Sequence, residues 1–360
     1  MVLYEKKGTM HISEDESNII SLVRVFATFL IVMCHYIVIY SKVAWLSMVF
    51  NVGVELFFII SGFLYGQKKI IGVRKWLIKQ IYKIAVPIYL YYLISGILLC
   101  AMRQLGDINL IGVIKQLLFL NGFIGGGIGN IATSHLWFMS YILLCYAITP
   151  ILQILRGKLR FGINMLIAVI AAVLEIVFIL TIELNNQTAY LVHLSGVVLY
   201  IFSYFFSCYW NREINKPCYI LLCALMLIAN IFRIVTNTYI DNNTAPLLFK
   251  IYFSVISAYS QCIFAMWIFM TIHIAYYAKK EIYFKIKKYI IFWDRRSMYM
   301  YIVHEMFIFA GVFNVTNWTQ SYIIKSIVFI ACSLLFCEIL YVSSNRIYNI
   351  PTDNKKSKRV

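Results

Sequence analysis

Residues 19–40 read IISLVRVFATFLIVMCHYIVIY, and within this run only Arg24 and His35 interrupt an otherwise apolar or weakly polar sequence. A helix needs about 20 predominantly apolar residues to cross the hydrocarbon core of a bilayer. The run is therefore long enough to span a membrane. Its two ionisable side chains are unusual, because charged groups are costly at membrane depth.

The rest of the chain repeats this pattern. Of its 360 residues, 62% are hydrophobic and only 13% are charged, against roughly 45–50% and about 25% in soluble domains. The apolar residues form long runs separated by short polar stretches, which predicts an all-α integral membrane protein with about ten transmembrane helices. The predicted spans are 19–40, 49–66, 84–102, 136–154, 163–182, 190–209, 217–236, 248–277, 297–314 and 321–343.

The positive charges indicate how these helices are oriented. Six segments hold 25 of the 32 Lys and Arg residues, and the intervening loops hold three. Because cytoplasmic loops are enriched in Lys and Arg, we expect both termini in the cytoplasm. No compact basic domain with stacking aromatics is present, so the net charge of +17 does not indicate nucleic-acid binding. The six segments are 1–18, 67–83, 155–162, 210–216, 278–296 and 344–360.

The domain organisation follows from these spans. We expect a cytoplasmic segment at 1–18, one membrane domain at 19–343 and a basic cytoplasmic tail at 344–360.

The apolar segment 108–120 is too short to span, so it is expected to lie on the surface or to re-enter the membrane. The Gly-rich segment 121–135 is either an ordinary loop or a flexible lid on the acceptor side. The nine cysteines form no CxxC pair, so no metal or disulfide framework is expected.

Arg24 and His35 share one face of the first predicted helix. Their eleven-residue separation amounts to almost whole turns and about 16.5 Å along the axis. One face thus presents a cation near the inner end and an imidazole deeper in the membrane. This arrangement suits an elongated substrate with an anionic head and a distant reactive group. Alternatively, Arg24 reaches the headgroups and His35 pairs with a neighbouring helix.

Two residues of the second predicted helix are further candidates. Glu55 is expected at a depth comparable to that of His35, where its carboxylate could fix the imidazole tautomer and stabilise the imidazolium. Ser61 could act as a nucleophile, although an intramembrane serine more often bonds to its own helix backbone.

The remaining candidates lie later in the chain. His135 is expected at the outer surface, in contact with an acceptor or with water, and Trp137 fits an interfacial anchor. In the span 297–314, Tyr301 and His304 share a face, and His304 is expected in the inner half near the depth of Arg24. A packing histidine is the alternative interpretation of His304.

Four stretches in this order resemble acyltransferase family 3, whose members include O-acetyltransferases of bacterial envelope glycans. They are NIISLVR at 18–24 with His35, GVELFFIISGFL at 53–64, HLWF at 135–138 with Pro150, and SMYMYIVH at 297–304. The chain departs from this pattern at Glu55, where Asp or an uncharged residue is common, and at Glu305, where Pro is common.

The resemblance implies transfer of an acyl group, with acetyl favoured, from cytoplasmic acyl-CoA to a hydroxyl of an envelope polysaccharide or lipid-linked sugar. It implies a multi-pass protein of a bacterial cytoplasmic membrane, with no metal and no permanently bound cofactor. The alternatives are a glycan or lipid flippase and a degenerate binding partner, but no inverted repeat supports the flippase. We assign catalysis to His35 and Glu55, donor binding to Arg24 and His304, and the acceptor side to Ser61, His135, Trp137 and Tyr301.

Overall fold

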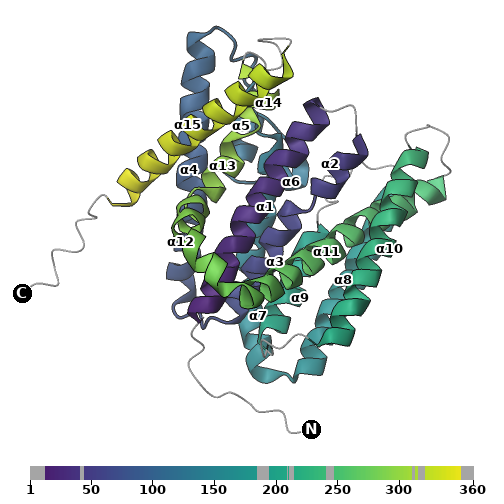
Figure 1. Cartoon of the computed structure of the whole chain (residues 1–360). Helices are drawn as coiled ribbons and strands as arrows, with labels where there is room; N and C mark the ends of the chain where they lie inside the picture. The colour runs from purple at the N-terminus through teal and green to yellow at the C-terminus, as the bar shows by residue number, and fades with distance from the viewer. Residues whose placement is uncertain are drawn as a thin grey trace, which may run out of the picture.

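The computed structural model describes residues 13–40, 44–184, 194–208, 210, 215–240, 247–309, 313–314 and 321–349. Within these ranges the chain is helical and contains no β-strand (Figure 1). The α-helices are α1 (Glu14–Tyr40), α2 (Ala44–Phe50), α3 (Gly53–Gly66), α4 (Val73–Ala101), α5 (Leu110–Leu117), α6 (Asn121–Ile124), α7 (Trp137–Lys158), α8 (Phe161–Leu184), α9 (Leu194–Ser207), α10 (Lys216–Ile240), α11 (Leu247–Ala278), α12 (Lys280–Asp294), α13 (Ser297–Val303), α14 (Met306–Phe309) and α15 (Tyr322–Tyr348). A 3₁₀ turn, η1 (Ser134–Leu136), precedes α7.

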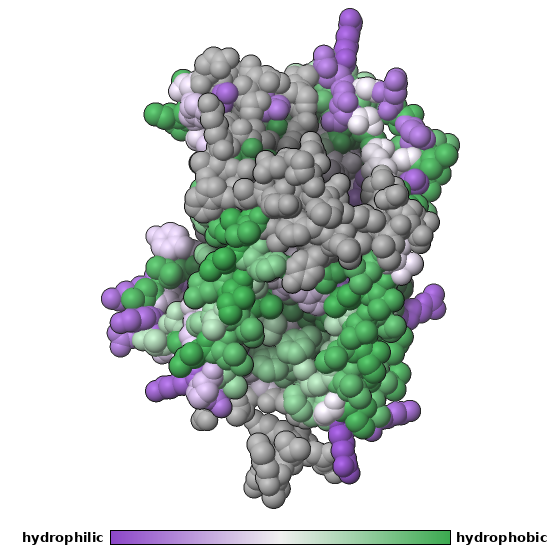
Figure 2. All heavy atoms as spheres, turned by 90° about the vertical axis from the view of Figure 1, so that its right-hand side faces the viewer, coloured by the Kyte–Doolittle hydropathy of each residue, from purple (hydrophilic) through white to green (hydrophobic). Residues whose placement is uncertain are grey.

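Eight of the described helices are long and apolar enough to cross a membrane, which supports a multi-pass membrane protein. They are α1, the α2–α3 unit, α4, α7, α8, α10, α11 and α15. Helix α9 is apolar but shorter, and the expected span 297–314 is not one continuous helix. Figure 2 looks onto the side of α8 and α10 and shows a broad hydrophobic surface with hydrophilic side chains toward its ends. Such a surface fits contact with lipid.

Glycines bring α3 close to its neighbours. A Cβ on Gly62 would collide with the carbonyl oxygen of Tyr200 in α9, and one on Gly53 would collide with that of Ala27 in α1. Small residues at such contacts let helix backbones approach each other within a membrane. Gly62 and Gly53 thus allow close packing, and α3 is held between α1 and α9.

The two most basic predicted loops are largely helical. The segment 67–83 contains the first turns of α4, and 278–296 contains α12. Helix α12 is joined to the start of α1 by ion pairs from Lys280 to Asp15 and from Lys287 to Glu14, each 2.7 Å long. The starts of α1 and α4 therefore share one end of the molecule with α12, and we call this end the basic side.

At the opposite end, α5 is a short helix with an exposed apolar face that includes Leu110, Ile111 and Ile114. The expectation that 108–120 contains a helix too short to span a membrane is confirmed. The Gly-rich segment beside it is held at two points by hydrogen bonds to its backbone carbonyls. Gln116 donates to the Gly126 carbonyl at 2.6 Å, and Tyr91 donates to the Ala132 carbonyl at 2.8 Å.

Candidate functional site

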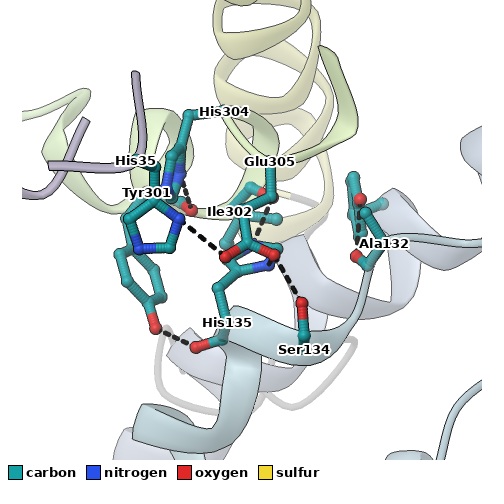
Figure 3. A network of polar contacts seen from close by, with 9 residues as sticks. His35, Ala132, Ser134, His135, Tyr301, Ile302, His304 and Glu305 are labelled. Carbon is teal, nitrogen blue, oxygen red and sulfur yellow. Dashed lines mark hydrogen bonds and ion pairs between the residues drawn. The ribbon is translucent and has the colours of Figure 1, made fainter. Parts of the chain in front are cut away.

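The centre of the candidate site is the carboxylate of Glu305, in the turn between α13 and α14 (Figure 3). His35 Nδ1 of α1 lies 2.9 Å from Oε1, and His135 Nδ1 lies 2.9 Å from Oε2. The Ser134 hydroxyl donates to Oε2 at 2.6 Å. Three groups from two distant parts of the chain thus converge on one buried carboxylate, and this set of contacts favours its ionised form.

The surroundings of His135 indicate its protonation state. Its Nδ1 faces the Glu305 carboxylate, and its Nε2 lies 2.9 Å from the Ile302 carbonyl oxygen. Both partners are acceptors, so both ring nitrogens are expected to carry a proton. We therefore assign His135 as an imidazolium that is paired with the Glu305 carboxylate. This buried pair is charge-balanced, which lowers the cost of placing it at membrane depth.

His304 completes the cluster. Its Nδ1 lies 2.7 Å from the Tyr301 carbonyl oxygen, so that nitrogen is assigned the proton. Its ring centroid is 5.0 Å from that of His35 and 5.2 Å from that of His135. Donor atoms of His35, His304 and Glu305 lie within 4.8 Å of one another, so these residues could in principle ligate a cation. The hydrogen-bonding donors around Glu305 already balance its charge, and we assign no metal here.

Two expectations about position are therefore wrong, and the carboxylate found beside His35 is not the one that was expected there. The carboxylate beside His35 is that of Glu305, whereas Glu55 interacts electrostatically with Arg233 and with Cys34, the neighbour of His35 on another face of α1. His135 is not at the outer surface, because it is only 3% exposed. His304 lies beside His35 and not near the depth of Arg24.

A cavity of about 690 Å³ leads into the molecule from the basic side. Its mouth is lined by Lys83, Arg295 and Asn345, and its wall includes Arg24 and Ser61. These two predicted site residues thus face one cavity, although they come from different helices. The cavity offers a cationic entrance to an interior that is otherwise largely aromatic and apolar.

Arg24 is both paired and accessible. Its guanidinium is bonded to the Asp294 carboxylate at 2.5 Å, and Ser21 donates to the same carboxylate at 2.9 Å. The Arg24 side chain remains 30% exposed. Partial burial, with the positive charges of Lys83 and Arg24, lowers the pKa of Lys68 at this end. Such crowding of cations favours an anionic ligand at the mouth.

Tyr301 and Phe138 lie between the cavity and the histidine cluster. Both line the cavity, with ring centroids 5.7 Å apart. The Tyr301 ring also lies 5.5 Å from that of His135, and its hydroxyl donates to the His135 carbonyl oxygen. Tyr301 therefore connects the two parts of the site. Trp137 is half-buried and packs against Phe138 and Tyr141, so it contributes to the aromatic core beneath the site.

Sequence reasoning missed the roles of Glu305 and Asp294. Glu305 was noted only as a departure from a family pattern. A signal was present, because an acidic residue within a predicted span is a functional candidate on cost alone. Asp294 gave no comparable signal, since it lies in a polar segment with several charged neighbours.

Comparison with protein families agrees with this geometry. A family model described as an acyltransferase domain matches residues 18–342. This range contains all four motifs and every residue of the histidine cluster. No curated protein and no solved structure matches the chain. The family match supports acyl transfer and does not favour the flippase interpretation. The chain therefore belongs to the acyltransferase family 3 membrane proteins that its motifs resemble.

Proposed function

We propose that the protein transfers an acyl group, with acetyl favoured, from cytoplasmic acyl-CoA to a hydroxyl of an envelope polysaccharide or lipid-linked sugar. The observation that carries this proposal is the contact between His35 Nδ1 and the Glu305 carboxylate at 2.9 Å. In a chain of this family, that contact supports His35 as a general base. The basic side is then the cytoplasmic side, in agreement with the distribution of Lys and Arg.

The donor is expected to occupy the cavity. Its phosphates would lie at the cationic mouth, where charge-assisted hydrogen bonds to phosphate are strong. Arg24 lies on the cavity wall, and His35 lies about 16.5 Å further along the same helix. An extended pantetheine arm can bridge a separation of this order. The thioester would then reach the level of Tyr301, next to the histidine cluster.

His35 would activate the acceptor. Glu305 holds the proton on Nδ1, which leaves the Nε2 lone pair to accept the proton of the acceptor hydroxyl. The acceptor oxygen forms the new C–O bond with the acyl carbon, and the C–S bond of the thioester then breaks. The leaving thiolate takes the proton back from the His35 imidazolium. Glu305 stabilises that imidazolium while it exists, which is the role first expected of Glu55.

The His35 side chain is accessible enough for this role. It is 28% exposed, whereas Glu305 and His135 are almost fully buried. A base must reach its substrate, whereas the groups that orient it are best held away from water. This difference in exposure supports His35 as the reacting imidazole and His135 as a supporting one. His304, buried beside both, belongs with the supporting residues and not with donor binding.

The test is transfer of label from acetyl-CoA into envelope glycan by membranes carrying wild-type protein, His35→Ala or His273→Gln at matched expression. His273 is a buried histidine of α11 that packs on Trp210 and is not part of the cluster, so it serves as the control. We expect transfer by the wild type and the control and none by His35→Ala. Equal transfer by all three would exclude His35 as the base, and transfer by none would reject acetyl-CoA as the donor.

A further inference from the structure

A second hollow lies on the other side of α13 from the donor cavity. It is a groove of about 550 Å³ between α1 and α15, with α13 as its floor. Its lining is almost entirely apolar and includes Phe29 and Val32 of α1, Met300 of α13, and Phe329 and Ile330 of α15. Both α1 and α15 are membrane-spanning helices, so the medium outside this groove is hydrocarbon.

The two hollows are separate but adjacent. Ser297 at the start of α13 lines both of them, and α13 packs against both α1 and α15. The donor cavity opens among cations, whereas the groove has no Lys, Arg, Asp or Glu in its lining. A phosphate-bearing donor therefore matches the first hollow, and the second matches a hydrocarbon chain.

The groove has a defined length and direction. Its lining on α1 runs from Val25 to Tyr36, eleven residues or about 16.5 Å along the axis. That is roughly half of the 30 Å hydrocarbon core, the depth of one leaflet. Trp293 lines the basic end, and the Tyr36 and Ser326 hydroxyls are hydrogen-bonded at the other end.

The polar end of the groove adjoins the reactive residue. Tyr36 follows His35 directly in α1, and Val32 lies one helical turn before them on the groove wall. A chain held in the groove would therefore carry its headgroup to the level of His35. A long acyl group on the donor does not fit this placement as well, because its thioester would enter through the cavity on the far side of α13.

We infer that the groove binds the hydrocarbon tail of a lipid-linked acceptor, with its sugar presented to His35. This inference rests on the proposed acyl transfer and narrows its acceptor from any envelope glycan to a lipid-linked sugar. Substrate enters laterally from the bilayer. The helix α13 then separates donor and acceptor along their length, and the two meet only where α13 ends at the histidine cluster.

Binding is tested independently of catalysis by photolabelling protein reconstituted in phosphatidylcholine vesicles. The probe is a single-chain alkyl glucoside with a diazirine in its chain, and the reference is a phosphatidylcholine with a diazirine at the same depth. Labelled peptides are mapped by mass spectrometry. The variants are Ile330→Trp, which fills the groove, and Leu335→Trp on the same helix outside it. Their native side chains are similarly exposed, at 54% and 60%, so neither substitution disturbs the core.

We expect the glucoside probe to label 25–36 and 326–334 at least fivefold more than the lipid-facing surfaces of α8 and α10. Ile330→Trp should reduce this labelling at least fivefold, and Leu335→Trp should leave it unchanged. His35→Ala should keep the labelling, so loss of the proposed activity and loss of the groove are distinguishable. Equal labelling of the groove by both probes would show that it holds only ordinary bilayer lipid, which would overturn the inference. Labelling that Ile330→Trp does not affect would overturn it as well.

Discussion

Replacement of Glu305 by Gln separates the charge of the carboxylate from its hydrogen bonds. The carboxamide has one acceptor and one donor group. Its oxygen can accept from His35 Nδ1, so the reactive tautomer is kept. Its NH₂ can donate to Nδ1 of a neutral His135, whose proton then lies on Nε2 and faces the Ile302 carbonyl. The Ser134 hydroxyl can turn to accept, so the variant network remains closed.

The expected loss is therefore electrostatic. At 2.9 Å, attraction between a His35 imidazolium and the carboxylate is about 5.7 kcal/mol at an effective dielectric constant of about 20. The variant also removes the His135 charge, which repels His35 from roughly twice that distance with about half that energy. The net loss is about 3 kcal/mol of transition-state stabilisation, or about 10²-fold in rate. Glu305→Ala removes the acceptor as well, and we expect a loss of about 10⁴-fold.

The assay is the initial rate of label transfer from acetyl-CoA by reconstituted protein, with folding monitored by gel filtration in detergent. Glu175→Gln is the matched control, because Glu175 is also a buried carboxylate in a membrane helix but is bonded to Tyr259. We expect its rate within threefold of the wild type. A folded Glu305→Gln with the wild-type rate would refute the reasoning. So would a loss as complete as that of Glu305→Ala, because the charge would then not be separable from the hydrogen bonds.

Three further predictions concern the cavity and the packing around it. Arg24→Gln should raise the KM for acetyl-CoA about 10- to 100-fold with a smaller effect on kcat, since a hydrogen bond to a charged group contributes about 1.5–3 kcal/mol. An unchanged KM would show that Arg24 does not bind the donor. Tyr301→Phe loses the hydrogen bond to the His135 carbonyl, and kcat should fall about tenfold with little change in thermal stability; a wild-type kcat would show that this bond does not position His135. Gly62→Ala forces α3 away from Tyr200 and should lower the stability of the protein by about 1–3 kcal/mol in thermal denaturation. Gly157→Ala is the control, because a Cβ there meets no atom within 4 Å, and it should not lower the stability. Equal stability of both variants would contradict the close packing.

The membrane character of the fold was predictable because the length of each apolar run can be compared directly with the thickness of the hydrocarbon core. The runs around α1, α7 and α8 correspond closely to described helices. Helix boundaries on the basic side were less predictable. Lys and Arg at 68–83 indicated a loop by hydropathy, but α4 begins at Val73 because a helix can continue past the bilayer into water. The expected total of ten spans and the orientation of the termini remain predictions.

The candidate site was predictable only where the residues share one helix. Arg24 and His35 lie on the face that spacing assigned to them, because α1 is continuous from Glu14 to Tyr40. The partner of His35 was not predictable in this way. Depth alone suggested Glu55, but depth does not determine the direction in which a side chain points. The glycine contacts with α1 and α9 constrain the rotation of α3 about its axis, and the carboxylate that lies against His35 Nδ1 is that of Glu305.

The break in the expected ninth helix explains why Glu305 was overlooked. In a continuous helix, consecutive side chains diverge by about 100°, so His304 and Glu305 could not both face His35. In the structure the helical pattern ends at Val303 and resumes at Met306. The intervening turn directs both side chains into the same cluster. An interrupted helix at membrane depth leaves backbone carbonyls available, and those of Tyr301 and Ile302 orient His304 and His135. The irregular backbone thus supplies the hydrogen bonds that fix the site, so straightening α13 into α14 would remove the cluster even with every side chain retained.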